Sequence, residues 1–188
     1  LVHHNLLIFG PLLVTEENSL VMAQAFLFEV TVPFPGPVAQ GTAASQKLQF
    51  MCKSAQLPGS DLGTVEIPYF GRMIKYAGNR TFPEWSTTII NDEDFKVHSS
   101  LVAWMDLING HSSNSRGVAI TTDYQVDAQV RHYGKTGETI KLVTFVNLWP
   151  SSLAPIDLSW DTNDTLEEFA VTWMYDYWSI EDKDVATN

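Results

Sequence analysis

The residues of this chain whose types could support catalysis are scattered, and none has the spacing that such chemistry requires. The nearest match is Gly134-Lys135-Thr136, which resembles the end of a phosphate-binding loop, but Gln129 stands where that motif requires a glycine. The segment also lies between two predicted strands, whereas a phosphate-binding loop joins a strand to a helix. The sequence therefore predicts a hairpin turn here and no nucleotide site.

Histidines and carboxylates predict no metal site. The five histidines form no pair at i, i+4 and belong to no zinc-binding pattern with a cysteine or carboxylate. The run Asp161-Thr-Asn-Asp164 begins like a calcium loop but lacks the required glycine and distal glutamate. Ser99-Ser100 lacks the glycines that flank a nucleophile elbow. We therefore expect no catalytic residue, no metal ion and no cofactor, and a protein that is not an enzyme.

The composition is that of one acidic domain. The 188 residues are 45% hydrophobic and 12% aromatic, which is enough for a sizeable core. The net charge of −11 excludes ordinary nucleic-acid affinity, because such binding depends on Lys and Arg displacing counterions from phosphates. Cys52 is the single cysteine, so no intrachain disulfide can form. The apolar run at residues 6–14 is too short to cross a bilayer, and we expect no membrane insertion.

Alternation of polar and apolar residues predicts a mainly antiparallel β fold. In residues 123–132, every second side chain is apolar or aromatic up to His132, and the residues between them are polar. A turn at 134–137 then leads to a second strand, which predicts a hairpin. The expected strands are 26–32, 48–52, 65–70, 73–76, 85–90, 123–132, 140–149 and 166–178. Between them, stretches rich in turn-forming residues at 33–46 and 53–63 predict two long loops, and loops of that length usually have a function.

One segment has helical spacing instead. A helix is expected at about 92–109, with Asn91 or Asp92 as its N-cap and Gly110 just beyond its end. Asp92, Glu93 and Asp94 are then explained by the positive end of the helix dipole rather than by acid–base catalysis. Its apolar residues share one face, which must pack against the rest of the fold. The residues of this face are Val97, Leu101, Trp104, Met105 and Ile108.

Several blocks of residues, in this order and spacing, resemble the tail tube protein of contractile-tailed bacteriophages. They are Leu27-Phe-Glu-Val30, Cys52-Lys-Ser-Ala-Gln-Leu-Pro58, Gly78-Asn-Arg-Thr-Phe82 with Trp85, Ile90-Asn-Asp-Glu-Asp94, the run from Val126 to Tyr133, Leu148-Trp-Pro150, Leu158-Ser-Trp160 and Tyr175-Asp-Tyr-Trp178. The resemblance covers residues 26–180, which we expect to form one β domain. Residues 1–25 are left as an N-terminal arm of unclear role, and residues 181–188 as a C-terminal tail.

The resemblance implies an antiparallel β-sandwich or small barrel flanked by one α-helix. It implies homo-hexameric rings that stack into a tube inside a contractile sheath and conduct DNA during ejection. The implied partners are other copies of the chain, the tail sheath protein, and the baseplate, tail-terminator and tape-measure proteins. Double-stranded DNA would pass without specific binding. The implied location is the virion tail, assembled in the host bacterial cytoplasm.

Alternation and charge together predict which residues face the lumen of such a tube. Carboxylates there would repel phosphates, whereas Lys and Arg would hold the DNA. The predicted lumen residues are Asp123, Gln125, Asp127, Gln129, Glu168 and Asp176.

At least one of the two long loops is predicted to contact a neighbouring subunit. The residues proposed for these contacts are Pro33, Phe34, Pro35, Gly36, Pro37, Leu57, Pro58 and Gly59. Deletion of residues 36–44 is expected to leave folding intact and to block tube growth.

Two alternatives remain open at this point. The chain could form the inner tube of a related contractile injection or secretion system, and the presence of DNA inside the particles would favour the phage tail instead. A β-sandwich that binds a small ligand through exposed aromatic residues is the other alternative. A stable monomer with a saturable pocket would support it.

Overall fold

Nine strands and two α-helices follow one another in the part of the chain that the computed structural model describes, residues 27–118, 120–159 and 166–182. The predicted arm at 1–25, the run 161–164 and residues 183–188 lie outside the described residues. Strand β9 continues to Asp182, so the predicted domain boundary at residue 180 falls inside a strand. In chain order the elements are β1 Phe28–Thr31, α1 Gly41–Met51, β2 Cys52–Ala55, β3 Asp61–Tyr69, β4 Arg72–Thr81, β5 Trp85–Ile90, α2 Lys96–Ile108, the short 3-10 helix η2 Thr121–Asp123, β6 Val126–Tyr133, β7 Thr139–Leu153, β8 Glu168–Met174 and β9 Tyr177–Asp182.

Seven of the strands form one antiparallel sheet that folds into two layers. The strand order is β1-β6-β7-β8-β5-β2, and β9 pairs with the other edge of β7. The first part of β7, 141–146, lies between β6 and β9, whereas its last part, 149–153, pairs with β8. Strand β7 therefore passes from a first layer, β1-β6-β7-β9, to a second layer, β7-β8-β5-β2. The expected mainly antiparallel β class is confirmed, with two helices instead of one.

Aromatic side chains fill the space between the two layers. Trp85 of the second layer stacks on Phe145 of the first with ring centroids 4.4 Å apart. Trp104 of α2 lies 5.9 Å from Trp173 of β8, and both are fully buried. The Trp173 indole donates to the hydroxyl of Thr87 at 2.9 Å, so its polar group is not left unpaired. Burial of each large side chain contributes about 1.5–3 kcal/mol before entropic costs, so this cluster fastens α2 to both layers.

Helix α2 begins at Lys96, so the predicted start near residue 92 is wrong. Neither Asn91 nor Asp92 caps it, because Phe95 occupies the N-cap position with a φ of 49° and no side-chain hydrogen bond. Asp92 instead turns the chain before the helix, where its carbonyl accepts the Phe95 N–H at 2.8 Å. The carboxylates of Asp92 and Asp94 form ion pairs with Lys47 of α1. These acidic residues therefore connect two helices and do not begin one.

Helix α1 occupies a region where the sequence predicted a loop and a strand. Ala44 and Leu48 are buried against the core, whereas Phe50 is 84% exposed, so the apparent alternation at 48–52 belongs to a helix. Before the helix, Val38 is 6% exposed and Phe34 packs on Trp104 with ring centroids 5.3 Å apart. Deletion of residues 36–44 would therefore remove core side chains. The expectation that folding would survive this deletion no longer holds.

Two further strand predictions need correction. The run 166–178 is two strands, because β8 ends at Met174 and the chain turns before β9 begins at Tyr177. The Asp176 N–H donates to the Val146 carbonyl at 3.1 Å within this turn. The run 123–132 begins three residues later than predicted, because Asp123 lies in η2.

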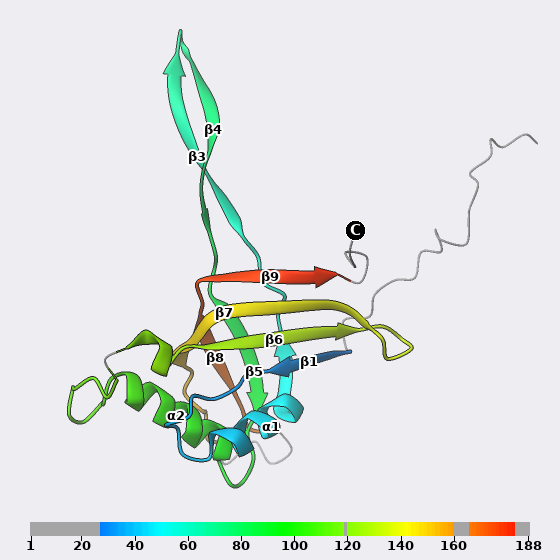
Figure 1. Ribbon diagram of the computed structural model, residues 1–188, viewed down its shortest axis with the longest axis vertical. Helices are drawn as coiled ribbons and strands as arrows, with labels where there is room; N and C mark the ends of the chain where they lie inside the picture. The colour runs from blue at the N-terminus through cyan, green and yellow to red at the C-terminus, as the bar shows by residue number, and fades with distance from the viewer. Residues whose placement is uncertain (1–26, 119, 160–165, 183–188) are drawn as a thin grey trace, which may run out of the picture.

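The helices and the β3–β4 hairpin lie at opposite sides of the fold. Helices α1 and α2 contact each other, and α1 also contacts β1 and β5, whereas α2 contacts β7. Figure 1 shows both helices at the bottom of the view and the hairpin extending away from the body at the top.

Candidate assembly surface

Strands β3 and β4 form a hairpin that pairs with no other strand of the described chain. Every residue of β3 is exposed. Nine residues at ~3.3 Å each give the strand a length of about 30 Å. A two-stranded hairpin is at best marginally stable in water unless something packs on it. The hairpin is therefore a candidate surface for contact with another molecule.

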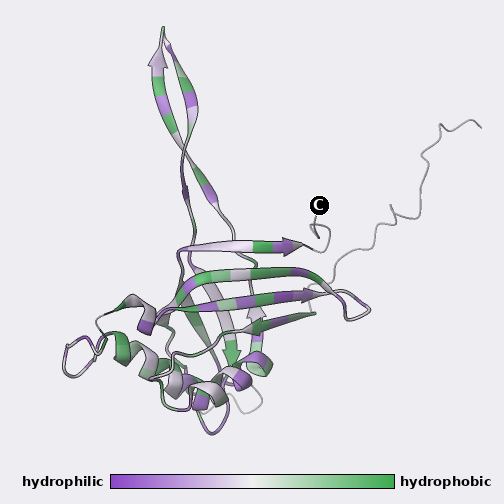
Figure 2. Cartoon of the chain, in the orientation of Figure 1, coloured by the Kyte–Doolittle hydropathy of each residue, from purple (hydrophilic) through white to green (hydrophobic). Residues whose placement is uncertain are grey.

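The hairpin has one apolar and one mixed face. The register opposes Val65 with Tyr76 and Ile67 with Ile74 on the apolar face. Val65, Ile67, Tyr69 and Tyr76 are 52%, 48%, 51% and 55% exposed. On the other face Lys75 Nζ lies 3.3 Å from Glu66 Oε1. Figure 2 shows hydrophobic and hydrophilic residues alternating along both strands. A contiguous exposed apolar face of this kind is typical of an interaction site.

The tip of the hairpin is a two-residue turn that presents an aromatic side chain. Phe70 and Gly71 have φ values of 44° and 81°, as a type I′ turn requires. The Phe70 ring lies edge-on to Tyr69 with centroids 4.7 Å apart, and the residue is 92% exposed. The turn therefore holds an aromatic group at the outermost point of the hairpin.

Aromatic side chains of the body hold the base of the hairpin. On the incoming side the Trp178 indole donates to the Gly59 carbonyl at 2.9 Å. On the outgoing side the Tyr175 hydroxyl donates to the Pro83 carbonyl at 2.8 Å. Burial raises the pKa of Tyr175, which keeps this hydroxyl protonated and able to donate. These bonds set the direction in which the hairpin leaves the body.

The two hairpin strands approach each other closely near the base. A Cβ added to Gly78 would lie 3.2 Å from the carbonyl carbon and oxygen of Gly63. The register also shifts between Leu62 and Thr64, and Figure 1 shows the two strands crossing in the lower part of the hairpin. Glycine at these positions permits the close crossing.

The outer face of the first layer is polar along β6, whereas β7 contributes Ile140, Leu142 and Val146 to it. In β6, Ala128 and Val130 point into the core, so Asp127, Gln129 and Arg131 point outward. The registers place one uncharged polar row across the four strands of this layer. That row is Thr31, Gln129, Thr144 and Ser179.

Arg131 on this face is surrounded by polar and acidic partners. Its register partner in β1 is Glu29, with 4.0 Å between Nη1 and Oε2. Nη2 donates to Gln129 Oε1 at 3.3 Å. The Tyr133 hydroxyl also donates to Glu29, and this bond raises the pKa of Tyr133. The guanidinium charge is thus offset within the face itself.

The structure brings together some of the residues predicted to face a lumen. Asp127 Oδ1 accepts the Asn147 N–H at 3.1 Å, and Asp176 Oδ2 accepts its side-chain amide at 2.6 Å. Gln129 lies two residues along β6 on the same face as Asp127. Glu168 lies apart, because it begins β8 in the second layer and forms an ion pair with Lys53 at 2.5 Å.

Asp123 and Gln125 precede β6 and do not belong to its alternating face. Asp123 is the last residue of η2 and is exposed. The Gln125 N–H donates to the Thr121 carbonyl at 3.0 Å, which is the hydrogen bonding of a helical turn. The strand-like alternation therefore assigned them to a face that they do not share.

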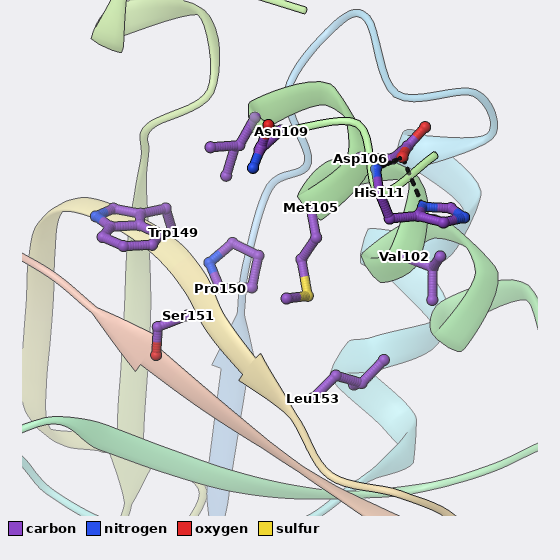
Figure 3. Close-up of a pocket in the computed structure, with 10 residues that line it drawn as sticks. Val102, Met105, Asp106, Asn109, His111, Trp149, Pro150, Ser151 and Leu153 are labelled. Carbon is purple, nitrogen blue, oxygen red and sulfur yellow. Dashed lines mark hydrogen bonds and ion pairs between the residues drawn. The ribbon is translucent and has the colours of Figure 1, made fainter. Parts of the chain in front are cut away.

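The predicted helix face divides between the core and a groove. Val97, Leu101 and Trp104 are buried, whereas Met105 and Ile108 are half-buried. The last two line a groove of about 470 Å³ between α2 and β7. Figure 3 shows Trp149, Pro150 and Leu153 of β7 across this groove from Met105.

The predicted loop residues differ in exposure. Pro33, Gly36 and Pro37 are exposed, Phe34 is half-buried and Pro35 is buried. Residues 57–59 lie at the base of the hairpin, where Leu57 is 51% exposed. Beyond this segment, the sequence predicted short strands at 65–70 and 73–76, and the structure has longer ones, β3 Asp61–Tyr69 and β4 Arg72–Thr81.

The residues that the sequence analysis considered for nucleotide binding and catalysis lie in a turn and in a helix. The turn 134–137 joins β6 to β7, with the Gly137 N–H donating to the Gly134 carbonyl at 3.0 Å. Ser100 is buried within α2. Within the described residues, no three His, Cys, Asp or Glu side chains gather in a way that could hold a metal ion. No helix in this part of the chain is long and apolar enough to span a membrane.

Related proteins match this chain over most of its length. Tail tube protein gp19 of Enterobacteria phage T4 is 30% identical over 157 residues, which are 83% of this chain and 90% of that protein. The tail tube protein of Serratia phage KSP90 is 25% identical over 148 residues, covering 79% of this chain and 82% of the relative.

Solved structures share the fold. The tube-terminating cap of the anti-feeding prophage superposes with a TM-score of 0.63 at 16% identity, covering 90% of this chain and 99% of the other. A chain of the sheath-tube complex of the PVC extracellular contractile injection system has a TM-score of 0.54 at 14% identity, with coverages of 87% and 94%. The family model described as phage tail tube protein matches residues 23–181. With this match over most of its length, the chain belongs to the phage tail tube protein family.

Proposed function

We propose that this structural subunit of a phage tail tube assembles into hexameric rings, which stack into a tube that conducts DNA. The unburied apolar face of the β3–β4 hairpin is the observation that carries the proposal. Four of its side chains are about half exposed, and no other strand of the described residues pairs with the hairpin. Another copy of the subunit would cover these side chains and stabilise the hairpin.

The free edges of the first layer support ring closure. Among the described strands, β9 pairs with β7 and β1 pairs with β6, so these two strands bound the layer. An exposed edge strand presents unpaired backbone groups that favour pairing with another chain. We place β9 of one subunit beside β1 of the next, so that the first layers join into one closed barrel.

The polar residues on the outer face of the first layer suit the lumen of that barrel. Its uncharged row and its carboxylates offer a phosphate backbone few favourable contacts. Glu29 lies against Arg131 and limits the one arginine of the β6 face as an attachment point for DNA. Of the predicted lumen residues, we retain Asp127, Gln129 and Asp176 for this surface.

The remaining partners follow from the kind of assembly. One structural relative belongs to a sheath-tube complex and another is a tube-terminating cap. We propose that this tube contacts a sheath and a terminator in the same way, together with baseplate and tape-measure proteins. DNA passes through in transit, and the subunit performs no catalysis.

Truncation of the hairpin tests the proposal. Replacement of residues 64–77 by a short turn leaves both layers and both helices in place. We expect the purified variant to keep the circular dichroism spectrum and melting temperature of the wild-type subunit, and electron microscopy to show no tubes. Full-length tubes from the truncated variant would contradict the assembly role of the hairpin.

Electron cryo-microscopy of wild-type tubes tests the ring and the lumen separately. We expect six subunits per ring and the outer face of the first layer toward the channel. A channel lined by the second layer would overturn the lumen assignment and leave the assembly role intact.

The fold similarity to a contractile injection system favours one second candidate, a tube that delivers cargo other than DNA. The particles that contain this subunit discriminate the two. Nuclease-protected DNA in purified particles supports the phage tail, and its absence supports the injection machine.

A further inference from the structure

The groove between α2 and β7 is an unfilled apolar surface on the body of the subunit. It has a volume of about 470 Å³, which lies within the range of ligand pockets. Val102, Met105 and Ile108 form one wall, and Trp149 and Leu153 the other. Figure 3 shows Met105 pointing from the helix toward Pro150. Methionine adapts its shape and makes favourable contacts with aromatic rings, so this lining suits an aromatic occupant.

The most exposed aromatic group of the described chain is at the hairpin tip. Phe70 is 92% exposed, and Tyr69 beside it is 51% exposed. We propose that this aromatic tip of one subunit docks in the α2–β7 groove of a neighbouring copy. The inference rests on the proposed assembly function and names the acceptor of the hairpin.

Charge at the two surfaces is complementary. Arg72 follows the tip directly, and the hairpin carries three basic and two acidic residues in a chain with a net charge of −11. Asp106 lies at the rim of the groove, 47% exposed, with its Oδ1 2.7 Å from His111 Nδ1. The backbone N–H and the ring of His111 lower the pKa of Asp106, which keeps the carboxylate ionised. A basic residue next to the tip would therefore meet an acidic rim.

The arrangement of the two surfaces favours contact between copies. The hairpin leaves the body on the side opposite the helices, so its tip points away from the groove of its own subunit (Figure 1). Complementary surfaces on opposite sides of one molecule join copies head to tail. Rings and stacked tubes both require contacts of this kind.

Disulfide trapping in assembled tubes tests the proposal. In a Cys52→Ala background we combine Phe70→Cys at the tip with Val102→Cys in the groove. The matched control combines Phe70→Cys with Gln46→Cys, an exposed position on α1 outside the groove. Tubes of each variant are oxidised with diamide and analysed on non-reducing gels, after electron microscopy has verified assembly.

We expect ladders of covalently linked subunits from the groove pair and at least tenfold less cross-linking from the α1 pair. Equal cross-linking of both pairs, or none in intact tubes, would overturn the docking site while leaving the assembly proposal standing. Failure of the wild-type chain to form tubes would instead contradict the proposed function. If Phe70→Cys alone prevents assembly, Tyr69→Cys replaces it beside the tip, and the cross-linking of the groove pair relative to the α1 pair again decides.

Discussion

The strongest test of the assembly surface is the substitution Ile67→Ser in the middle of the hairpin. Ile67 is 48% exposed in the isolated subunit and lies on the apolar face opposite Ile74. Full burial of an isoleucine contributes ~1.5–3 kcal/mol, so covering the exposed half contributes about 0.7–1.5 kcal/mol at an assembly contact. Since 1.4 kcal/mol is a factor of about ten in an equilibrium constant, loss of this contact raises the critical concentration about threefold to tenfold.

The assay is the protein concentration at which tubes first sediment. Glu66→Gln is the matched control, because Glu66 neighbours Ile67 on the opposite face and makes only an exposed ion pair with Lys75. We expect it to change the critical concentration less than about twofold. Both variants should fold as stably as the wild type, within about 0.5 kcal/mol, because neither position belongs to the core.

Two results would refute this reasoning. An unchanged critical concentration for Ile67→Ser would show that the apolar face stays uncovered in the tube. An equal rise in the critical concentration for Glu66→Gln would show that both faces of the hairpin contribute to the contact with its neighbour.

Three other perturbations probe separate parts of the structure. Trp178→Phe keeps an aromatic ring at this position but removes the N–H that donates to the Gly59 carbonyl. We expect the stability to fall by about 1 kcal/mol, measured by thermal unfolding, and the critical concentration to rise several-fold, measured by sedimentation. Lys47 holds the pKa of Asp94 well below its usual 3.8, so this pairing stabilises the fold above pH 3.8 and is lost as pH falls through the depressed value. Asp94→Asn should therefore lower stability at neutral pH and leave it nearer the wild-type value in strong acid, and an unchanged difference between acid and neutral unfolding curves would contradict the pairing. Burial raises the pKa of Cys52 to about 11, so at pH 8 iodoacetamide should modify it roughly 100-fold more slowly than the unfolded chain, and equal rates by mass spectrometry would disprove its burial.

Much of the β structure could be predicted where a strand lies between core and solvent. The hairpin of β6 and β7 follows from alternation on both sides of a glycine turn, and β5 matches its predicted range of 85–90. In β5 the side chains of Trp85, Thr87 and Ile89 are buried, and those between them are half-buried. A period of two is strong there because each strand has one core face.

The failures have local causes. Helix α1 follows a stretch rich in proline and glycine, and its first turn contains no acidic residue and no side-chain cap. Packing of Ala44 and Leu48 against the core stabilises this helix, whereas the local sequence provides little stabilisation. The run 166–178 alternates on both sides of Asp176, yet the chain turns there, because β7 offers pairing partners in both layers. Alternation indicates which side chains point to opposite faces of a sheet. It does not indicate where the chain turns from one pairing strand to another.

The acidic composition and the alternating strands were sufficient to indicate an acidic β domain, because a period of two depends only on residues close together along the chain. The ordered blocks of residues indicated the tail tube family through their resemblance to it. The sequence alone also indicated that phosphate, metal and nucleophile motifs were incomplete, since those motifs are defined by spacing. Tertiary structure decided which polar residues share a face, separating Glu168 from Asp127 and bringing Asp176 beside Asn147. It alone identified the exposed hairpin and the α2–β7 groove, because exposure depends on what the rest of the fold leaves uncovered.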